Sequence, residues 1–403
     1  MRATETKVEA FLSSNKTQFV IPVYQRNYDW SIAQCKQLID DILEVGTNNN
    51  MSAHFIGSIV YIHDDVYTSS RMAELSIIDG QQRLTTLTLI YLALHHLAHD
   101  LKDEGLVSEI SETYLINKFA PEKEKLKLRP TDHNDKALKY LLRHDKSEEF
   151  LEFSKLIDNF RYFRTRITEE NYQIVLKGLA KLMFVEISLD REKDNPQRIF
   201  ESLNSTGLEL SQADLIRNYI LMDLNRVDQL EIYQNYWEVI ENLARDETTN
   251  DSRISDYIRD YLTLENKKIP NKNKVYVEFK NKYPTTTINA LKENLKPIKN
   301  LAKYYHRLIN PKHEPDSEIR LSLEYISRLE INVAFPFLIQ VYSDYATSVI
   351  NKETFLEILE LIQSFVWRRF IVGLPTNSLN KTFMNLYDKV DLNDYLHSIQ
   401  KIL

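Results

Sequence analysis

Apolar residues cover most of the helix circumference over positions 84–101, which is typical of a central, buried helix rather than a surface one. The preceding residues 75–78 favour a short buried strand, and Asp79 and Gly80 supply a turn between strand and helix. A strand that runs through a glycine turn into a helix presents free backbone N–H groups at the helix start. The pattern therefore predicts a place where an anion such as phosphate can bind.

Other apolar runs predict strands at 17–22, 54–63 and 182–189, and a helix from a cap at Asp29 or Ser31 to about residue 45. Within the second run, Gly57 indicates a bulge or a close approach of another group. We expect an α+β fold, with a small mixed sheet around the buried helix and a helical insertion at about 102–181.

Residues 125–132 alternate in polarity and end at Pro130, as an edge strand does. The slightly favoured interpretation is that Lys125, Lys127 and Arg129 are exposed edge residues. The alternative is that Arg129 faces a ligand.

Beyond Arg226 the pattern is helical throughout, with a Lys/Asn-rich connector at 271–284. Helices are expected at 229–244, 252–264, 287–308, 317–331, 334–345, 352–372 and 378–386. We therefore predict two domains, 1–225 and an all-helical 226–403.

Composition narrows the functional classes. No apolar run approaches the ~18 residues that span a bilayer, and a single cysteine, Cys35, excludes an internal disulfide, so we expect a cytoplasmic protein without a membrane partner. His95 and His99 lie four positions apart but no carboxylate accompanies them, so we expect no metal site. P-loop, dinucleotide-binding, hydrolase and kinase motifs are absent.

Charge is uneven although the net charge is −7. The stretch 267–307 holds eleven Lys and Arg against Glu278 and Glu293. A solvated surface is the common reason for such a run. The alternative is a basic face for DNA, with Lys272 and Lys274 as contacts.

Three polar segments stand out. In the first, Asp79 and Gln82 have the spacing of a capping box, and each is equally open to a role as cap or ligand. Arg83 opposes the helix dipole, which costs roughly a few tenths of a kcal/mol. We interpret it as a ligand-binding residue, with a salt bridge to a nearby carboxylate as the alternative.

The second segment is 21–30, where Gln25 and Arg26 lie among Tyr24, Tyr28 and Trp30. Core packing of these aromatics is one interpretation, and stacking on a base or binding an anion is the other. The third segment is 196–218, which reads as helix, turn and helix. Its turn contains Asn204 and Gly207, and its second helix has a capping box of Ser211 and Asp214.

In this order the three segments resemble the signature of GmrSD-type restriction proteins, a group that includes the phosphorothioate-sensing SspE. The quoted matches are 21–30, the stretch Ile78-Asp-Gly-Gln-Gln-Arg-Leu-Thr-Thr86, and 200–218, so the resemblance spans about the first 225 residues. It implies a ParB/sulfiredoxin-like fold with a nucleoside triphosphatase site, often preferring GTP. It also implies a role in the restriction of modified DNA or in phage defence.

The resemblance also implies roles for residues. Asp79, Gln82 and Arg83 would be catalytic, and the nucleotide, with Mg²⁺, would be bound by a larger set: Tyr24, Gln25, Arg26, Gly80, Gln81, Thr85, Asn204, Gly207 and Asp214. Tyr28 and Trp30, with Lys272 and Lys274, would contact DNA. No histidine–asparagine–histidine nuclease constellation is present, so we expect cleavage to need a nuclease domain or subunit from outside this chain.

Three functional hypotheses follow. The first is a nucleotide-hydrolysing regulatory module of a restriction system, with a homo-oligomer as one form of its assembly. The second is a non-enzymatic binder of modified DNA, for example phosphorothioate DNA. The third, ranked last, is a ParB-like nuclease in which Asp79 holds a metal, because no second carboxylate is placed beside Asp79 by the sequence.

Overall fold

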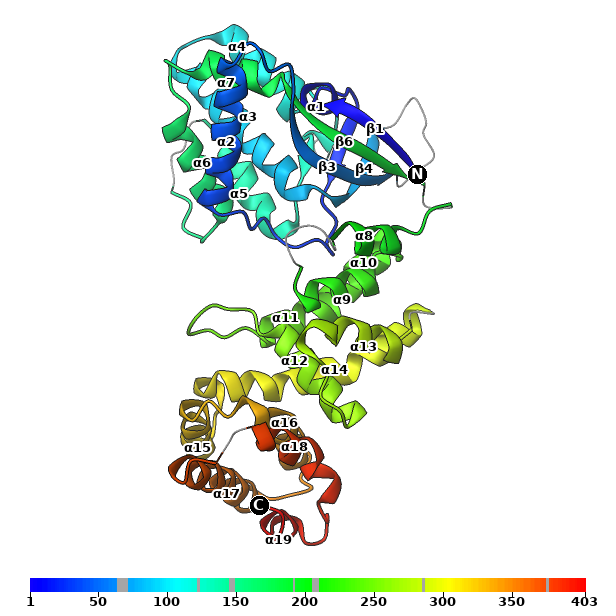
Figure 1. The fold of residues 1–403 in the computed structure, drawn as a ribbon, viewed down its shortest axis with the longest axis vertical. Coiled ribbons are helices and arrows are strands. Elements are labelled where there is room, and N and C mark those ends of the chain that lie inside the picture. The colour runs from blue at the N-terminus through cyan, green and yellow to red at the C-terminus, as the bar shows by residue number, and fades with distance from the viewer. Residues whose placement is uncertain are drawn as a thin grey trace. The chain divides into compact units, whose positions relative to one another are not determined.

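The computed structural model describes residues 1–63, 72–121, 124–144, 149–190, 193–204, 210–284, 287–374 and 377–403. The chain divides into two compact units, residues 1–207 and 208–403, coloured blue to green and green to red in Figure 1. Segment 208–225 thus belongs to the second unit. The domain boundary expected after residue 225 stays a prediction. No helix among the described residues is long and apolar enough to cross a membrane.

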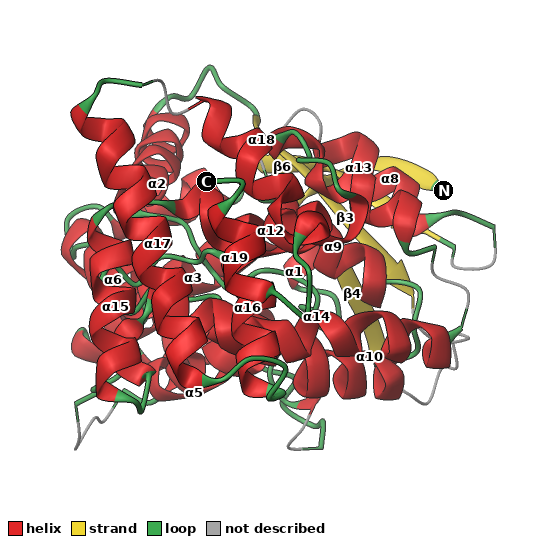
Figure 2. Ribbon diagram, turned by 90° about the horizontal axis from the view of Figure 1, so that it is seen from below, coloured by secondary structure: helices red, strands yellow, loops and turns green. Residues whose placement is uncertain are grey.

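The first unit is built on one six-stranded mixed sheet, whose strands are drawn in yellow in Figure 2. The strand order is β1-β6-β3-β4-β2-β5. The strands are β1 (Arg2–Lys7), β2 (Thr17–Val20), β3 (His54–His63), β4 (Ala73–Asp79), β5 (Leu128–Arg129) and β6 (Leu182–Leu189). The predicted mixed α and β class is confirmed, whereas the ParB/sulfiredoxin-like arrangement stays a prediction.

Strand β1 was not predicted because it carries almost no buried side chain. Five of its six residues are exposed, so hydrophobic alternation is missing. It is held by antiparallel pairing with β6, from Arg2 opposite Ser188 to Lys7 opposite Met183. Backbone pairing at a sheet edge thus replaces the side-chain pattern that sequence reasoning detects.

Helix α3 (Gln81–Asp100) is the buried centre of the first unit, as predicted, with buried residues on all of its faces. Helix α6 (Lys155–Arg166) and helix α4 (Glu104–Ile110) pack against it, and α2 (Ile32–Thr47) packs on α6 and on α7 (Tyr172–Leu179). Figure 1 shows this helical layer beside the sheet. The described part of the unit also contains α1 (Val8–Leu12), α5 (Asp132–Leu142), α8 (Pro196–Asn204) and the π-helical turn η1 (Ser111–Leu115).

Strands β3 and β4 position the start of α3. They pair antiparallel with Val60 opposite Asp79, so the end of β4 lies beside the middle of β3. The predicted irregularity at Gly57 is confirmed, because the β3–β6 register shifts between Phe55 and Ser58 and Gly57 has a φ of +104°. The bulge opens space above β3 that a neighbouring side chain enters.

Strand β5 ends the sheet as predicted, but the interpretation of Lys127 as an exposed edge residue is wrong. Lys127 is 2% exposed, and its Nζ donates hydrogen bonds to the carbonyls of Leu12 at 2.8 Å, Ser14 at 3.2 Å and Thr113 at 2.6 Å. These carbonyls belong to or follow short helical turns whose last C=O groups need donors. Burial lowers the pKa of Lys127 to about 8.

The second unit is all-helical among its described residues, as predicted. The expected connector at 271–284 is wrong, because it contains η4 (Lys272–Lys274) and α13 (Val275–Lys282), which buries Val275, Tyr276 and Phe279 on one face. Its other helices are α9 (Gln212–Leu221), α10 (Arg226–Ile232), η3 (Tyr233–Trp237), α11 (Glu238–Leu243), α12 (Ile254–Asn266), α14 (Ile288–Ile309), η5 (Pro311–His313), α15 (Ser317–Arg328), η6 (Asn332–Ala334), α16 (Phe335–Ala346), α17 (Lys352–Ile371), α18 (Asn377–Leu386), η7 (Tyr387–Lys389) and α19 (Tyr395–Gln400).

Candidate functional site

The start of α3 is formed by Gly80 in the left-handed conformation, with φ +90°. A Cβ at this position would lie 2.9 Å from the Ser58 carbonyl oxygen, so both φ and space favour glycine. The capping-box interpretation of Asp79 and Gln82 is wrong, because Gly80 occupies the N-cap and Asp79 still belongs to β4. Among the described residues no side chain caps this helix start, although Gly80 and the next two residues are buried.

Gln82 holds the loop that leads from β2 to α2. Its Oε1 accepts hydrogen bonds from the backbone N–H groups of Asp29 at 2.8 Å and Trp30 at 3.2 Å, and its Nε2 donates to the Asn27 carbonyl at 3.2 Å. The side chain is 7% exposed. Gln82 therefore clamps three backbone groups of the loop to the first turn of α3.

Gln81 and Gln25 make a second, reciprocal connection between the same two segments. Gln81 Nε2 donates to the Arg26 carbonyl at 2.9 Å, and Gln25 Nε2 donates to the Ile78 carbonyl at 2.9 Å. Both glutamines are 7% exposed. The structure thus brings the Gln25–Arg26 segment against the strand–helix turn, and the role of both segments in lining one nucleotide cleft stays a prediction.

Arg83 reaches back across β3. Its Nη2 donates to the Ser58 carbonyl at 2.7 Å and lies 3.4 Å from Asp79 Oδ2, which confirms the alternative of a salt bridge. Its Nη1 occupies the space above Gly57, where a Cβ would lie 2.4 Å away. The buried Arg83 Nε has no hydrogen-bond partner among the described residues. The side chains of Arg83 and Asp79 remain 26% and 29% exposed, so the ion pair is reachable from solvent.

The aromatic residues of the loop lie in the core. Tyr24 is 1% and Tyr28 is 6% exposed, while Trp30 packs partly buried against the same core. Tyr28 Oη lies 2.8 Å from Thr86 Oγ1 and accepts a hydrogen bond from Asn159 Nδ2 at 3.0 Å. Burial raises the pKa of the Tyr28 hydroxyl. The core-packing interpretation holds for these side chains in this conformation, and their roles toward nucleotide or DNA stay predictions.

Arg26 and Arg129, which lie outside α3, differ in how closely they pair with carboxylates. Arg26 is 24% exposed, and its Nη1 lies 4.0 Å from Asp29 Oδ2, a loose contact because Asp29 also pairs with Lys155. Arg129 faces Glu74 with both terminal nitrogens, at 3.4 and 3.1 Å. Arg26 is therefore the more available of the two for an added anion.

The third predicted segment divides between the two units. Gly207 lies outside the described residues, and Asn204 ends α8 with its side chain also outside them. Asp214 confirms the predicted capping box with Ser211 at the start of α9, and it pairs with Arg217 at 2.6 Å. Thr85 is buried in the second turn of α3. The nucleotide roles of these residues stay predictions.

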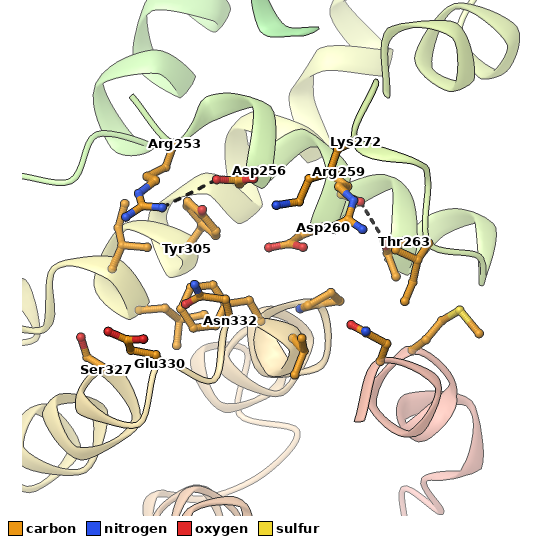
Figure 3. A pocket seen from close by; sticks show the side chains of 18 of the residues that line it. Arg253, Asp256, Arg259, Asp260, Thr263, Lys272, Tyr305, Ser327, Glu330 and Asn332 are labelled. Atoms are coloured by element: carbon orange, nitrogen blue, oxygen red, sulfur yellow. Dashed lines mark hydrogen bonds and ion pairs between the residues drawn. The ribbon is translucent and has the colours of Figure 1, made fainter. Parts of the chain in front are cut away.

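The second unit contains a cavity of about 660 Å³ that sequence reasoning missed. Figure 3 shows Asp260 of α12 and Lys272 of η4 among its polar lining residues. Burial and the nearby Asp256 carboxylate raise the pKa of Asp260. Lys272, predicted to contact DNA, thus lines this cavity, while Lys274 is exposed on the same turn.

Comparison with known proteins gives one family. A sequence model described as the GmrSD restriction endonuclease, N-terminal domain, matches residues 8–221. The matched region contains strands β2 to β6 of the sheet, α3 and the loop that the three glutamines hold, and it extends through α9, whereas the edge strand β1 (Arg2–Lys7) precedes it. A search of curated proteins gave no match.

Proposed function

This chain belongs to the GmrSD restriction endonuclease N-terminal domain family and so takes part in a restriction system. On that premise we propose that its first unit binds a nucleoside triphosphate at the start of α3. GTP is the proposed preferred nucleotide, with Mg²⁺ beside it. Hydrolysis of the γ-phosphate by water would release a nucleoside diphosphate and inorganic phosphate. The proposed role is regulatory, with DNA cleavage left to a nuclease domain or subunit.

The observation that carries the proposal is the uncapped start of α3. The first N–H groups of a helix have no partner within the helix, and a buried helix end usually finds one from a side chain. Here Gly80 supplies no side chain, and none of the described residues caps the helix. Backbone N–H groups at such a start, with the positive end of the helix dipole, favour a phosphate oxygen.

Arg83 supports the same proposal. Its guanidinium has five N–H donors, of which the Ser58 carbonyl and Asp79 use only a part. The 3.4 Å contact to Asp79 is long for a charge-assisted hydrogen bond, which is typically about 2.7–2.9 Å. An added phosphate can therefore engage Arg83 without a desolvated ion pair being broken first. Asp79 is then the carboxylate available to Mg²⁺ or to the attacking water.

Gln82 enters this proposal as a positioning residue. Its side chain already bonds three backbone groups of the loop at 27–30, so it would reach a nucleotide only after the loop opens. Opening would also free Tyr24 and Tyr28 from the core. The closed loop is one state, and the nucleotide would favour the state to which it binds more tightly.

Calorimetry of the whole chain with ATP, GTP, CTP and UTP, each with Mg²⁺, tests the proposal. We expect at least one nucleotide to bind with one site per chain, and phosphate release to accompany it. Omitting Mg²⁺ is expected to weaken the binding. An absence of heat and of phosphate release with all four nucleotides would refute the proposal.

A second candidate is direct binding of modified DNA. Its support is the 267–307 stretch, where Lys280 lies over the rings of Tyr219 and Tyr276, and Lys303 lies over Tyr304. Lysines interleaved with aromatics suit a nucleic-acid strand. However, Lys267, Lys282 and Lys292 each pair with a carboxylate, which reduces the free charge. Equal affinity for phosphorothioate and unmodified duplexes would count against a sensing role.

A further inference from the structure

Three potential metal ligands meet at the C-terminal end of α14, although the sequence led us to expect none. His306 lies in the last turn of α14, His313 ends η5, and Glu247 comes from the loop between α11 and α12. One ligand atom from each residue lies within 4.8 Å of the other two. His306 and His313 are seven positions apart, whereas Glu247 lies more than fifty positions before them, so the fold brings the carboxylate to the two imidazoles.

The distances suit one small ion. His313 Nε2 lies 2.9 Å and His306 Nε2 lies 4.0 Å from the carboxylate oxygens of Glu247. Ligand atoms of a tetrahedral zinc lie about 3.4 Å apart, given Zn–N and Zn–O distances of about 2.0–2.1 Å. The observed separations lie on both sides of this value. All three ligand atoms lie within 4.8 Å of one another, so side-chain rotation alone, without movement of the backbone, is expected to bring them around one ion.

The surroundings of His306 provide independent support. Its Nδ1 lies 2.9 Å from the Leu243 carbonyl oxygen, so Nδ1 carries the proton and Nε2 is left with a free lone pair toward Glu247. Histidines that bind metals commonly donate their other ring N–H to a carbonyl or carboxylate in this way. The His306 side chain is only 15% exposed, so most of its ring is packed against the protein.

Asn310 holds the loop that carries Glu247, the third potential ligand. Its Oδ1 accepts the backbone N–H of Glu247 at 2.9 Å, and its Nδ2 donates to the Arg245 carbonyl at 2.8 Å. Asn310 is 3% exposed. The Glu247 loop is thus tied to the end of α14, one turn after His306, by a buried amide with two specific bonds.

Glu247 has a competing partner. Lys312 Nζ lies 2.7 Å from Glu247 Oε2, the same oxygen that His313 contacts. A surface ion pair of this kind contributes about 0–1 kcal/mol. A metal ion at the site would replace the lysine ammonium. If Glu247 is a metal ligand, removing Lys312 should strengthen metal binding. If Glu247 serves only the surface ion pair, removing Lys312 should not strengthen it.

We propose that Glu247, His306 and His313 bind a divalent transition-metal ion, with a fourth position open to water. Two imidazoles and one carboxylate suit zinc and neighbouring ions rather than magnesium or calcium, which prefer oxygen ligands. The site opens to solvent, since His313 is 44% and Glu247 is 36% exposed. It is independent of the nucleotide site proposed for the first unit.

Equilibrium dialysis of the whole chain against ZnCl₂ tests the proposal. The wild type is expected to bind one equivalent of zinc at this site. The variants His306→Ala and His313→Ala should each weaken its binding at least about tenfold. Lys312→Met should tighten it, because the competing ammonium is gone. Circular dichroism checks that each variant is folded.

His144→Ala is the matched control. His144 is 41% exposed and pairs with Asp100 at 3.2 Å, so it resembles His313 without belonging to a three-ligand group among the described residues. This variant should leave zinc binding unchanged. Zinc affinity that is the same in the wild type, His306→Ala and His313→Ala would overturn the proposal. So would a Lys312→Met variant that binds zinc more weakly than the wild type.

Discussion

Replacing Gly178 by Ala is expected to lower the thermal unfolding midpoint of the first unit by about 6–12 °C. The change corresponds to about 3 kcal/mol of lost stability, at the upper end of the usual cost of overpacking a core. The reason is that a Cβ at Gly178 would lie 2.1 Å from the Ile42 carbonyl oxygen. A backbone carbonyl within a helix cannot rotate away as a side chain can.

The contact is reciprocal. A Cβ at Gly46 of α2 would lie 2.2 Å from the Ile174 carbonyl oxygen of α7, just as Gly178 of α7 meets Ile42 of α2. The two helices thus cross with their backbones in contact at two glycines. Any side chain at either position forces the helices apart and opens space in the core around them.

Gly105→Ala is the control for this prediction. Gly105 lies in α4, and the nearest atom to an added Cβ is Asp103 Oδ1 at 3.4 Å, an ordinary contact. Alanine should therefore be neutral or raise stability by about 0.4–1 kcal/mol. Differential scanning calorimetry of both variants measures the effect. A Gly178→Ala variant that melts within a degree of Gly105→Ala would contradict the close crossing of α2 and α7.

Replacing Arg83 by Ala is expected to weaken nucleotide binding by about 10- to 100-fold. Hydrogen bonds to charged groups contribute about 1.5–3 kcal/mol each, and phosphate contacts belong to this class. Arg83→Lys keeps the charge but loses the planar fork that holds the Ser58 carbonyl and Asp79 together. We therefore expect an intermediate affinity for this variant, measured by calorimetry with the preferred nucleotide.

Arg129→Ala separates a loss of the site from a general loss of stability. Arg129 is 22% exposed and pairs with Glu74, near the start of β4, whereas Arg83 pairs with Asp79 at its end. Both variants remove a half-buried arginine from an ion pair with a carboxylate of β4. Only Arg83→Ala should change nucleotide affinity. Equal losses in the two variants would show that Arg83 acts through folding alone.

Local patterns predicted the elements around the candidate site well. The strand and the long buried helix at 75–101 follow from apolar periodicity, and the glycines at 57 and 80 correctly indicated a bulge and a turn. The mistaken capping box has a local cause as well. Asp79 and Gln82 have the spacing, but a left-handed glycine between them moves the helix start by one residue.

Contacts between distant segments could not be predicted in the same way. Gln25 and Ile78 are 53 positions apart, and nothing in either segment specifies that the amide of one meets the carbonyl of the other. Lys127 is similar, because its three carbonyl acceptors come from two other segments. A lysine in an alternating run is usually exposed, and only the packed structure reveals that this one caps buried backbone.

The central claim is that the start of α3 binds a nucleotide, and hydrogen–deuterium exchange of the whole chain with and without the preferred nucleotide tests it most directly. We predict slower exchange for the amides of residues 80–83, because phosphate oxygens would accept N–H groups that have no partner within the helix, whereas the Leu84 N–H already donates to the Gly80 carbonyl at 3.0 Å. Peptides from α7, far from this turn in sequence, provide the internal reference. Nucleotide that binds by calorimetry but leaves the exchange of residues 72–100 unchanged would contradict the claim.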